Sequence, residues 1–368
     1  MIKILYIIST LSDTGPVNII YETIKNIDRT KFEPIILTLS PETKNSAKNK
    51  FFEIADIHSL NLSRKEGYLK WKLFKEKVRQ INPDIIHSHC FRSILFSGIY
   101  LKEYKSVSTI HNDYTQDYVM NYGKFIGNIM VKLQTFALKN IDINCSVSEK
   151  LSEILKQKIR GINFNYVNNG IDIEKFVPAD DKKKLREELG LPLNKKIFIY
   201  VGALSERKNP KLLINAFKNI ENKDIYLILR GDGLLKEECV KLIDNYDNIR
   251  ILNRVNNLDM YYKACDFYIS ASNSEGLPGA VIEGIACGLP VVLSNIEQHK
   301  YVLSSNAGKL FNVNDGIDLK IAVNDILNEN YYELSKRARE LALSRFSSKI
   351  MTKNYEYKYM ELLNNENY

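Results

Sequence analysis

The chain has 368 residues, enough for roughly two domains, and 45% of them are hydrophobic, enough to bury cores of ordinary size. These figures exclude intrinsic disorder as its main state. The formal net charge of +8 is unevenly spread: the residues up to Pro178 carry 25 Lys and Arg against 18 Asp and Glu, and the remainder carries 27 against 26.

The sequence shows no signal for membrane insertion or export. No apolar run approaches the ~20 residues that span a bilayer. Met1 leads directly into a strand-like run rather than a charged segment with a cleavage site. Five scattered cysteines without a Cys-x-x-Cys pair predict neither a disulfide framework nor a zinc site. We therefore expect a protein of the reducing cytoplasm.

Short β-branched runs alternate with amphipathic stretches, a pattern typical of parallel strands covered by helices on both faces. In the first half the predicted strands are Ile2–Ser9, Glu33–Leu39, Asp84–His87, Val107–His111, Ile141–Cys145 and Asn165–Asn168. In the second half they are Lys196–Val201, Ile225–Arg230, Ile249–Leu252, Phe267–Ser270 and Val291–Ser294. The pattern predicts two successive α/β domains.

The predicted domains are residues 1–175 and 176–347. The turn Asn168-Asn169-Gly170 closes the first strand series, and a polar segment with Pro178 precedes the next helix pattern. After Ser294 the strands nearly stop, and residues 330–368 are expected to be helical, with an apolar stripe of Leu334, Ala338, Leu341 and Ala342. The tyrosine-rich end, about residues 348–368, is predicted to pack back on the first domain.

The strongest motif is the acidic segment Ser274-Glu275-Gly276-Leu277-Pro278-Gly279-Ala280-Val281-Ile282-Glu283, which follows a predicted strand. Pro278 suits the first turn of a helix and Gly288 its end, so a short helix is predicted from about residue 278. Its free N-terminal amides would favour a phosphate. Because Glu275 lies ahead of this helix and Glu283 inside it, the two carboxylates fit two separate hydroxyl-binding positions. A capped helix with two solvated acids is the alternative.

A second loop, from Gly202 to Pro210, carries two adjacent cations between a strand and a helix. Arg207 can bond two phosphate oxygens at once, and Lys208 can act as a point charge, so the pair is suited to a diphosphate. A solvated loop is the alternative, because Lys and Arg are abundant in this chain.

Other nucleotide signatures are missing. Gly231-Asp232-Gly233 follows a strand, but Lys236 stands where a dinucleotide fingerprint has its third glycine, and no Gly-Lys-Ser/Thr follows Gly202. Dehydrogenases and P-loop NTPases are therefore disfavoured. The sequence also lacks Asp-x-Asp, the common device that holds a metal ion to a diphosphate, so a clamp of cationic side chains is expected in its place.

Three histidines and one glycine are the candidates in the first half. Gly15 lies in the loop after the first strand, so its amide is expected at the ligand edge of the sheet. His111 ends the strand Val107–His111, where it could reach a sugar hydroxyl, although a histidine there is more often structural. His87 and His89 lie on one strand face, but no third ligand accompanies them, so no metal site is expected.

In this order the motifs resemble those of the family 4 glycosyltransferases of the GT-B class, over nearly the whole chain. The matching pieces are Pro83 to His89, Thr109-Ile110-His111, Asn168 to Asp172 with Phe176-Val177-Pro178, Gly202 with Arg207-Lys208, Gly231-Asp232-Gly233, and the pair Glu275 and Glu283. The resemblance implies an α/β fold of two Rossmann-like α/β/α domains facing across a cleft, with the C-terminal helix on the first domain.

The resemblance also implies roles for these residues. The donor would be a nucleotide diphosphate sugar, of the UDP type, bound mainly by the second domain. Arg207 and Lys208 would stabilise the leaving diphosphate. Glu275 and His111 would contact the donor sugar, and Glu283 the ribose. Further donor-binding positions are expected at Gly15, Gly202, Arg254, Val255, Gly276, Leu277, Gly279 and Ala280. The implied reaction retains the anomeric configuration and uses neither a metal nor another cofactor.

Two basic, aromatic stretches of the first half are candidates for contact with anionic lipid, with an ordinary solvated surface as the alternative. The first spans residues 64–79 around Trp71 and Phe74, and a helix face packed on the sheet is expected to contain Leu69, Leu73 and Ile81. The second runs from Tyr118 to Lys139 and includes Tyr122, Lys124, Phe125, Ile126, Met130 and Lys132.

The sequence therefore predicts a glycosyltransferase whose acceptor is a glycan, such as a lipid-linked saccharide of a bacterial surface polysaccharide, with peripheral attachment at the inner face of the cell membrane. A non-catalytic GT-B subunit of a transferase complex and a GT-B sugar-nucleotide epimerase would share the fold. Nucleic acid is not an expected partner, because the sequence contains no module for reading single strands or grooves.

Overall fold

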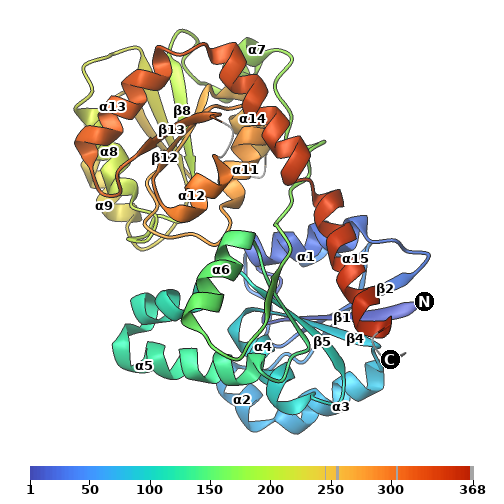
Figure 1. Ribbon diagram of the computed structural model, residues 1–368. Helices are drawn as coiled ribbons and strands as arrows, with labels where there is room; N and C mark the ends of the chain where they lie inside the picture. The colour runs from blue at the N-terminus through green and yellow to red at the C-terminus, as the bar shows by residue number, and fades with distance from the viewer. Residues whose placement is uncertain (245, 254–256, 304–305, 365–368) are drawn as a thin grey trace. The chain divides into compact units, whose positions relative to one another are not determined.

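The computed structural model describes residues 1–244, 246–253, 257–303 and 306–364, which form two α/β units (Figure 1). The first unit consists of Met1–Gly170 and Ser348–Tyr368, and the second of Ile171–Ser347. The first segment thus ends at Gly170, whereas the sequence predicted an end at residue 175. Ile171 already belongs to the second unit, where its amide donates to the carbonyl of Phe346 at 2.9 Å.

The described part of the first unit contains a sheet of seven parallel strands in the order β3-β2-β1-β4-β5-β6-β7. The strands are β1 Ile2–Ile8, β2 Phe32–Thr38, β3 Asp56–Ser59, β4 Ile85–His89, β5 Lys105–Ile110, β6 Ile143–Ser146 and β7 Phe164–Tyr166. The helices are α1 Gly15–Asn26, the short 3-10 helix η1 Lys48–Lys50, α2 Arg64–Leu69, α3 Trp71–Ile81, α4 Cys90–Tyr100, α5 Tyr114–Leu138, α6 Glu149–Lys158 and α15 Ser348–Asn364.

The second unit contains, among its described residues, a sheet of six parallel strands in the order β10-β9-β8-β11-β12-β13. The strands are β8 Lys196–Val201, β9 Ile225–Arg230, β10 Ile249–Leu252, β11 Phe267–Ser270, β12 Val291–Ser294 and β13 Gly308–Phe311. The helices are α7 Lys182–Leu189, α8 Pro210–Lys218, α9 Lys236–Leu242, α10 Leu258–Ala264, α11 Gly279–Ala286, α12 Glu297–Val302, α13 Gly316–Leu327 and α14 Tyr331–Arg345.

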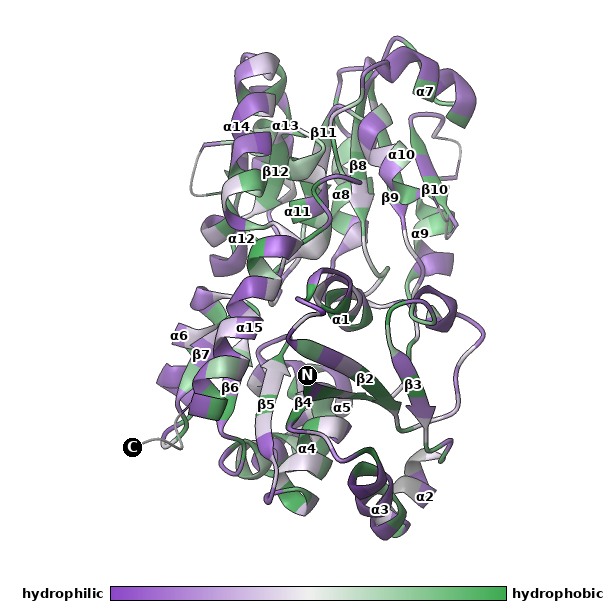
Figure 2. Ribbon diagram, turned by 90° about the vertical axis from the view of Figure 1, so that its right-hand side faces the viewer, coloured by the Kyte–Doolittle hydropathy of each residue, from purple (hydrophilic) through white to green (hydrophobic). Residues whose placement is uncertain are grey.

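The central strands are apolar along their length because helices cover both faces of each sheet. Leu5, Tyr6 and Ile7 of β1 are fully buried, as are Ile197 to Tyr200 of β8. Figure 2 shows this contrast: much of β2 and β12 is hydrophobic, whereas the surface helices α7 and α14 are mostly hydrophilic. This buried, two-sided pattern is the one that the sequence predicted for parallel strands covered by helices on both faces.

Two edge strands, β3 and β13, were not predicted from the sequence. For β13 the expectation was that the strands nearly stop after Ser294. β3 pairs with β2 and β13 pairs with β12, each over only four residues. None of the four β3 residues is fully buried, and Leu310 of β13 is 37% exposed. An edge strand covered on fewer sides needs no continuous apolar run, so the pattern that marks central strands is missing.

The C-terminal tail forms two helices that belong to different units. In α14 the buried residues are the predicted stripe, Leu334, Ala338, Leu341 and Ala342. α15 packs on α1 in the first unit, and the two helices lie side by side in Figure 1. Tyr355 and Tyr359 of α15 are fully buried. The expected return of the tyrosine-rich end to the first domain is therefore confirmed.

One predicted helix face was wrong. Ile81 of α3 is buried, as expected, but Leu69 and Leu73 are 81% and 45% exposed. Phe74, expected among the surface aromatics, is fully buried, and Trp71 stacks on Tyr100 with ring centroids 4.9 Å apart. The helix breaks at Lys70 between α2 and α3, so a single helical periodicity does not extend across residues 64–81. Within the described residues, no helix combines the length and the apolar character needed to cross a membrane.

Candidate active site

The acidic segment lies in the second unit, between the carboxyl end of β11 and α11. Pro278 is the N-cap of α11, so the helix begins at Gly279, one position later than the expected Pro278. Gly288, just beyond the helix end, has a φ of 72°. This left-handed conformation suits glycine and ends the helix where the sequence predicted. The first amides of a helix have no partners within the helix, so those after Pro278 are available to an anion.

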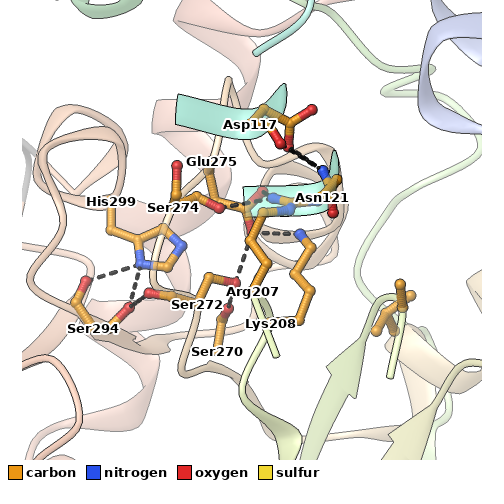
Figure 3. A network of polar contacts seen from close by, with 12 residues as sticks. Asp117, Asn121, Arg207, Lys208, Ser270, Ser272, Ser274, Glu275, Ser294 and His299 are labelled. Carbon is orange, nitrogen blue, oxygen red and sulfur yellow. Dashed lines mark hydrogen bonds and ion pairs between the residues drawn. The ribbon is translucent and has the colours of Figure 1, made fainter. Parts of the chain in front are cut away.

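Glu275 is the centre of a charged cluster (Figure 3). Its side chain is 6% exposed, and its carboxylate contacts both predicted cations. Nη1 of Arg207 lies 3.1 Å from Oε2 of Glu275 and donates to the carbonyl of Ser274 at 2.7 Å. The ammonium group of Lys208 contacts Oε1. The structure thus joins three candidate residues that come from two separate loops.

The electrostatics of this cluster fix its charge state. Burial by itself would raise the pKa of Glu275, but the attraction of Lys208 and Arg207 outweighs it and lowers the pKa to about 2. Burial lowers the pKa of Lys208, against the opposing attraction of Glu275. At neutral pH the carboxylate is ionised and two cations share it, which leaves the cluster with an excess of positive charge for an anionic ligand.

Three supporting residues were missed by the sequence analysis. The hydroxyl of Ser272 donates to Oε1 of Glu275 at 2.7 Å, and the hydroxyl of Ser294 donates to the carbonyl of Ser272 at 2.6 Å. Nδ1 of the fully buried His299 lies 2.8 Å from the carbonyl of Ser294 and donates its proton there. Burial lowers the pKa of His299 to about 4, so its ring is neutral at pH 7. Ser272 lies in the same loop as Glu275, whereas Ser294 ends β12 and His299 belongs to α12.

The loop that carries the cations is tied to the acidic segment through the backbone. The amide of Asn273 donates to the carbonyl of Arg207 at 2.8 Å, and its side-chain amide donates to the carbonyl of Glu206 at 3.1 Å. Asn209, the N-cap of α8, has a φ of 48°, a left-handed turn that asparagine tolerates. Arg207 and Lys208 are therefore held by a tight turn and by a bridge from the neighbouring strand.

The Gly231-Asp232-Gly233 motif has a packing role in the structure. A Cβ atom on Gly231 would lie 1.9 Å from the carbonyl oxygen of Gly202, and one on Gly233 would lie 2.4 Å from the carbonyl oxygen of Leu204. A Cβ atom on Gly202 would lie 2.7 Å from the hydroxyl of Tyr200, so a side chain there would require Tyr200 to shift. These glycines let the loops after β8 and β9 lie backbone against backbone beside the cations.

Glu283 is held in a different environment from Glu275. The hydroxyl of Tyr262, on α10, donates to Oε2 of Glu283 at 2.9 Å and lies 3.1 Å from the carbonyl of Ala280. Burial and the neighbouring carboxylate raise the pKa of Tyr262 well above its usual value, so the phenol stays protonated and remains a donor. The two carboxylates thus have separate partners, in agreement with two separate roles. Sequence analysis did not find Tyr262.

The other predicted donor-binding residues differ in their setting. Gly276 and Leu277 are buried in the loop before α11, whereas Ala280 is half-buried in its first turn. At Gly15 and Gly279 an added Cβ atom would meet no atom within 4 Å, so neither glycine is required by packing in the chain. That open space fits the approach of a ligand to the backbone. Arg254 and Val255 lie outside the described residues.

His111 lies in the first unit, directly after β5, beside His89 of β4. Nε2 of His111 is 3.2 Å from Nδ1 of His89, and burial lowers the pKa of His111 to about 4. Nε2 of His89 is buried without a hydrogen-bond partner in the described part of the chain. Burying a bare acceptor is less costly than burying an unpaired N–H, so His89 carries its proton on Nδ1 and donates it to His111. The proton of His111 is then on Nδ1, where it can be donated to a ligand.

A buried hydrogen-bond network beside this pair reaches the C-terminal helix, and the ring centroids of His87 and His89 lie 4.3 Å apart. The ring nitrogens of His87 lie 2.7 Å from the hydroxyls of Tyr359 and Thr109. The hydroxyl of Thr109 is 2.9 Å from that of Tyr355. Both nitrogens of His87 are therefore occupied, which does not favour a metal ligand. Among the described residues, no three His, Cys, Asp or Glu side chains lie where they could hold a metal ion together.

Two family models match the chain, one on each side of the boundary between the units. The model for glycosyltransferase family 4 matches residues 14–175, and that for glycosyl transferases group 1 matches residues 181–345. Together they cover both the loop of Gly15 and the charged cluster around Glu275. The chain belongs to the family 4 glycosyltransferases of the GT-B class, and it is a glycosyltransferase.

Relatives of known activity support this assignment. The chain is 27% identical over 310 residues to the alpha-monoglucosyldiacylglycerol synthase of Streptococcus pneumoniae, covering 78% of this chain and 69% of the relative. It is 28% identical to an Escherichia coli UDP-Gal:alpha-D-GlcNAc-diphosphoundecaprenol alpha-1,3-galactosyltransferase, covering 67% and 65%. The O-antigen biosynthesis glycosyltransferase WclY of Escherichia coli is 24% identical, with 98% of each chain covered.

Solved structures share the fold. The sucrose-phosphate synthase of Thermosynechococcus elongatus matches with a TM-score of 0.85 and 18% identity, covering 99% of this chain and all of that one. Anabaena HepE, solved in complex with UDP, matches with a TM-score of 0.82 and 16% identity, covering 98% of this chain and all of HepE. At such identities the likeness concerns the fold alone.

Proposed function

We propose that the protein transfers a sugar from a UDP-sugar to a lipid-linked saccharide, with retention of the anomeric configuration, in the synthesis of a bacterial surface glycan. The observation that carries this proposal is the buried cluster in which Arg207 and Lys208 share the carboxylate of Glu275. A fixed cationic pair beside a helix N-terminus is suited to the negative charge that grows on a departing diphosphate.

The carboxylate of Glu275 is suited to orienting groups rather than to attack. Its Oε1 atom accepts bonds from Lys208 and Ser272, and its Oε2 atom accepts one from Arg207. An ionised carboxylate offers about four acceptor positions, so one remains for a hydroxyl of the donor sugar. Electron density shared with two cations makes a weak nucleophile, which supports a reaction without a covalent sugar intermediate.

In the proposed reaction the acceptor hydroxyl attacks the anomeric carbon on the face from which the diphosphate leaves. The bond between that carbon and the phosphate oxygen breaks, and the nucleoside diphosphate leaves with the bonding electrons. A new bond forms to the acceptor oxygen, whose proton passes to the departing phosphate. Arg207 and Lys208 stabilise the leaving group, and the Nδ1–H of His111 is the proposed donor to the transferred sugar.

The choice of donor and acceptor is supported by the relatives. HepE binds UDP, and the related Escherichia coli transferase uses a UDP-sugar and a diphosphoundecaprenol-linked acceptor, as their names state. A Campylobacter jejuni relative, 32% identical over 196 residues, also acts on a diphospho-undecaprenol-linked saccharide. The roles of Gly15, Gly279 and Glu283 in holding the donor are part of the same proposal.

A panel of nucleotide sugars tests this function directly. UDP-, GDP- and ADP-linked sugars would each be assayed for donor hydrolysis and for thermal stabilisation, since a bound ligand stabilises the fold by mass action. We expect stabilisation and turnover with one or more UDP-sugars. Stabilisation without turnover on any lipid-linked acceptor would indicate a non-catalytic subunit. Interconversion of the sugar without transfer would indicate an epimerase.

A further inference from the structure

Helix α5 exposes an unusual amount of apolar surface. Seven of its large hydrophobic side chains are between 41% and 80% exposed: Met120, Tyr122, Phe125, Ile126, Ile129, Leu133 and Phe136. The helix lies on the outside of the first unit and packs on α4 (Figure 1). Single exposed apolar residues are ordinary, but a contiguous set on one element marks a surface that binds something apolar.

The exposed residues form one stripe. At 3.6 residues per turn, Phe125, Ile126, Ile129, Leu133 and Phe136 fall within an arc of roughly 100°. The opposite face is also filled: Gly127, Gln134, Ala137 and Leu138 are buried. In the second half of α5 the side that meets the protein is thus buried, with Gln134 bonded to the hydroxyl of Tyr118, and the exposed stripe is apolar as well. A soluble surface helix has a polar outer face, so this outer face lacks its partner.

The stripe begins beside a break in α5. Gly123, with a φ of 78°, interrupts α5, and all residues from Met120 to Ile126 are exposed. The most exposed of the seven side chains is Phe125, at 80%. A bend that carries aromatic and aliphatic side chains beyond the body of the unit can insert them into another phase without moving the sheet.

The charge around the stripe is of one sign. From Tyr118 to Lys139 the chain has Lys124, Lys132 and Lys139 and no Asp or Glu. In the part of the chain that the structure describes, no acidic side chain pairs with these three lysines. Lys102 places its ammonium group 5.9 Å from the ring centre of Phe136. The stripe therefore combines apolar side chains with four cations.

A shallow groove runs beside the stripe. It has a volume of about 300 Å³ and is lined by Val131, Lys132, Thr135, Phe136, Lys139 and Ile159. Apolar walls with two ammonium groups at the rim fit an acyl chain whose anionic headgroup lies beside those lysines. The basic stretch around α3 shows no such combination, because Phe74 is buried and Trp71 stacks on Tyr100.

We propose that the second half of α5, from Met120 to Lys139, is a membrane-docking surface: its apolar stripe inserts among the headgroups of an anionic bilayer and its lysines pair with the lipid phosphates. The inference deepens the proposed function by stating how the enzyme reaches a lipid-linked acceptor. It rests on the proposed function only for that purpose, because lipid binding can be measured without donor or acceptor.

The first test is co-sedimentation of the full chain with vesicles. Phosphatidylcholine vesicles are compared with phosphatidylcholine and phosphatidylglycerol mixtures, at low and at high salt. We expect binding that rises with phosphatidylglycerol and falls with salt, since the Debye length shrinks from about 30 Å at 0.01 M to about 10 Å at 0.1 M. Absence of binding to anionic vesicles at low salt would overturn the proposal.

Two sets of variants separate the contributions. Replacing Lys124, Lys132 and Lys139 together by Gln should weaken binding to anionic vesicles about 100-fold, at about fivefold per lysine. The matched control replaces three exposed lysines of the second unit, Lys183, Lys223 and Lys241, by Gln, and should leave binding within about twofold of wild type, a margin typical of rim charges.

Replacing Phe125, Ile129 and Phe136 together by Gln should weaken vesicle binding at least about 1000-fold, because each buried side chain of this size contributes roughly tenfold or more. The matched control replaces the exposed Leu234, Ile317 and Tyr332 by Gln and should bind like wild type. Both sets should keep the wild-type thermal stability and UDP affinity, which separates this test from that of the proposed function.

Sedimentation equilibrium tests whether the stripe binds a second copy of the chain instead of a membrane. If the wild type is a dimer without lipid, the Phe125, Ile129 and Phe136 variant is a monomer, and neither binds vesicles, the stripe is a contact between two copies of the chain and the proposal is wrong. Unchanged vesicle binding by that variant would overturn it equally.

Discussion

The first unit orders its strands β3-β2-β1-β4-β5-β6-β7, and the second orders the equivalent strands β10-β9-β8-β11-β12-β13. Both place polar groups where strands end, at the edge where open α/β sheets bind ligands. The chemistry of the two clusters differs. The first unit has neutral histidines, His87, His89 and His111, whereas the second has an ionised carboxylate between two cations.

The two units also differ in net charge, and here it is the first unit that carries the excess. The first unit contains 27 Lys and Arg against 19 Asp and Glu, and the second contains 25 against 25. The whole excess of +8 therefore belongs to the unit whose buried cluster is uncharged. The second unit concentrates charge inside, where low dielectric strengthens it against one small anion, whereas the first spreads charge over a surface, where it acts on an extended partner. One fold thus serves two kinds of recognition.

The largest expected effect comes from the charged cluster. Arg207→Ala and Lys208→Ala should each lower kcat about 10- to 150-fold, because charge-assisted hydrogen bonds to the leaving diphosphate are worth ~1.5–3 kcal/mol. Initial rates of donor hydrolysis would measure this. The control is Lys211→Ala, in the first turn of the helix that follows the two cations, where it pairs with Glu206 and Glu238 outside the cluster. Turnover near wild type in both cluster variants would rule out the cationic clamp.

Acid should destabilise the first unit before the second. The pKa of His87 is lowered to about 3 and that of His111 to about 4, chiefly by burial, whereas an unfolded histidine titrates near 6.5. As the pH falls below 6.5 the unfolded chain binds protons that the folded chain cannot. Stability is therefore lost from about pH 6.5 down to about pH 4 for His111 and about pH 3 for His87, by about 1.4 kcal/mol for each unit of pKa difference at each site.

Fluorescence of Trp71 reports this loss, because it is the only tryptophan and lies in the first unit. Urea midpoints should fall from pH 7 to pH 5. His299→Gln is the control for the second unit and should leave the pH dependence of the Trp71 transition unchanged. A midpoint that does not change with pH would show that the first unit's histidines are accessible to protons.

The two carboxylates of the second unit should separate nucleotide from sugar. Glu283→Ala should weaken the binding of free UDP and of UDP-sugar alike, about tenfold, as expected for a lost hydrogen bond to an ionised group. Glu275→Ala should leave the affinity for free UDP unchanged, because it removes no ribose contact and leaves both cations in place. Calorimetry measures both affinities. The opposite pattern would exchange the two roles.

Removal of the Tyr262 hydroxyl tests the geometry around Glu283. Tyr262→Phe should weaken UDP binding a few-fold, since it removes only the hydrogen bond that orients the carboxylate of Glu283. Tyr261→Phe is the neighbouring control and should bind UDP as the wild type does. Equal affinities in all three proteins would mean that Tyr262 does not position Glu283.

A smaller effect is expected in the first unit. His89→Leu should lower kcat about fivefold with UDP affinity unchanged, because His111 loses the N–H that fixes its tautomer and a single neutral hydrogen bond is worth about 1 kcal/mol. His89→Asn, whose side-chain amide can replace that N–H, should restore most of the rate. If the two variants lose activity equally, the hydrogen bond between His89 and His111 is not what positions His111.

Metal removal should have no effect. The sequence has no Asp-x-Asp, and the proposed clamp of Arg207 and Lys208 supplies the positive charge that a metal would supply. Initial rates after exhaustive treatment with EDTA should equal those of the untreated enzyme. Loss of activity that Mg²⁺ or Mn²⁺ restores would contradict this expectation.

Most of the central architecture could be predicted from the sequence. The strands buried on both faces, such as β1, β8 and β11, are continuous apolar runs, so their period and composition identify them. The acidic segment, with Pro278 before the helix and Gly288 after it, also carries its structure locally. Such features depend on neighbours within a few residues, which the sequence shows directly.

The remaining features depend on contacts between distant residues. The edge strands β3 and β13 exist because a neighbouring strand offers hydrogen bonds, not because of their own composition. The distant partners of the two carboxylates come from other elements: Arg207 and Lys208 for Glu275, and Tyr262 for Glu283. The outward stripe of α5 could be identified only after α4 was seen to cover the opposite face.

The sequence by itself therefore determined the positions of the central strands along the chain, the family motifs and the excess of positive charge in the first half. Only the tertiary structure decided that Arg207, Lys208 and Glu275 form one cluster and that Phe125 faces solvent whereas Phe74 is buried. The physical reason is the separation of the interacting residues along the chain. The hydrophobic periodicity of a helix or strand involves residues that are close in sequence, whereas ion pairing and burial depend on which distant segments the fold brings together.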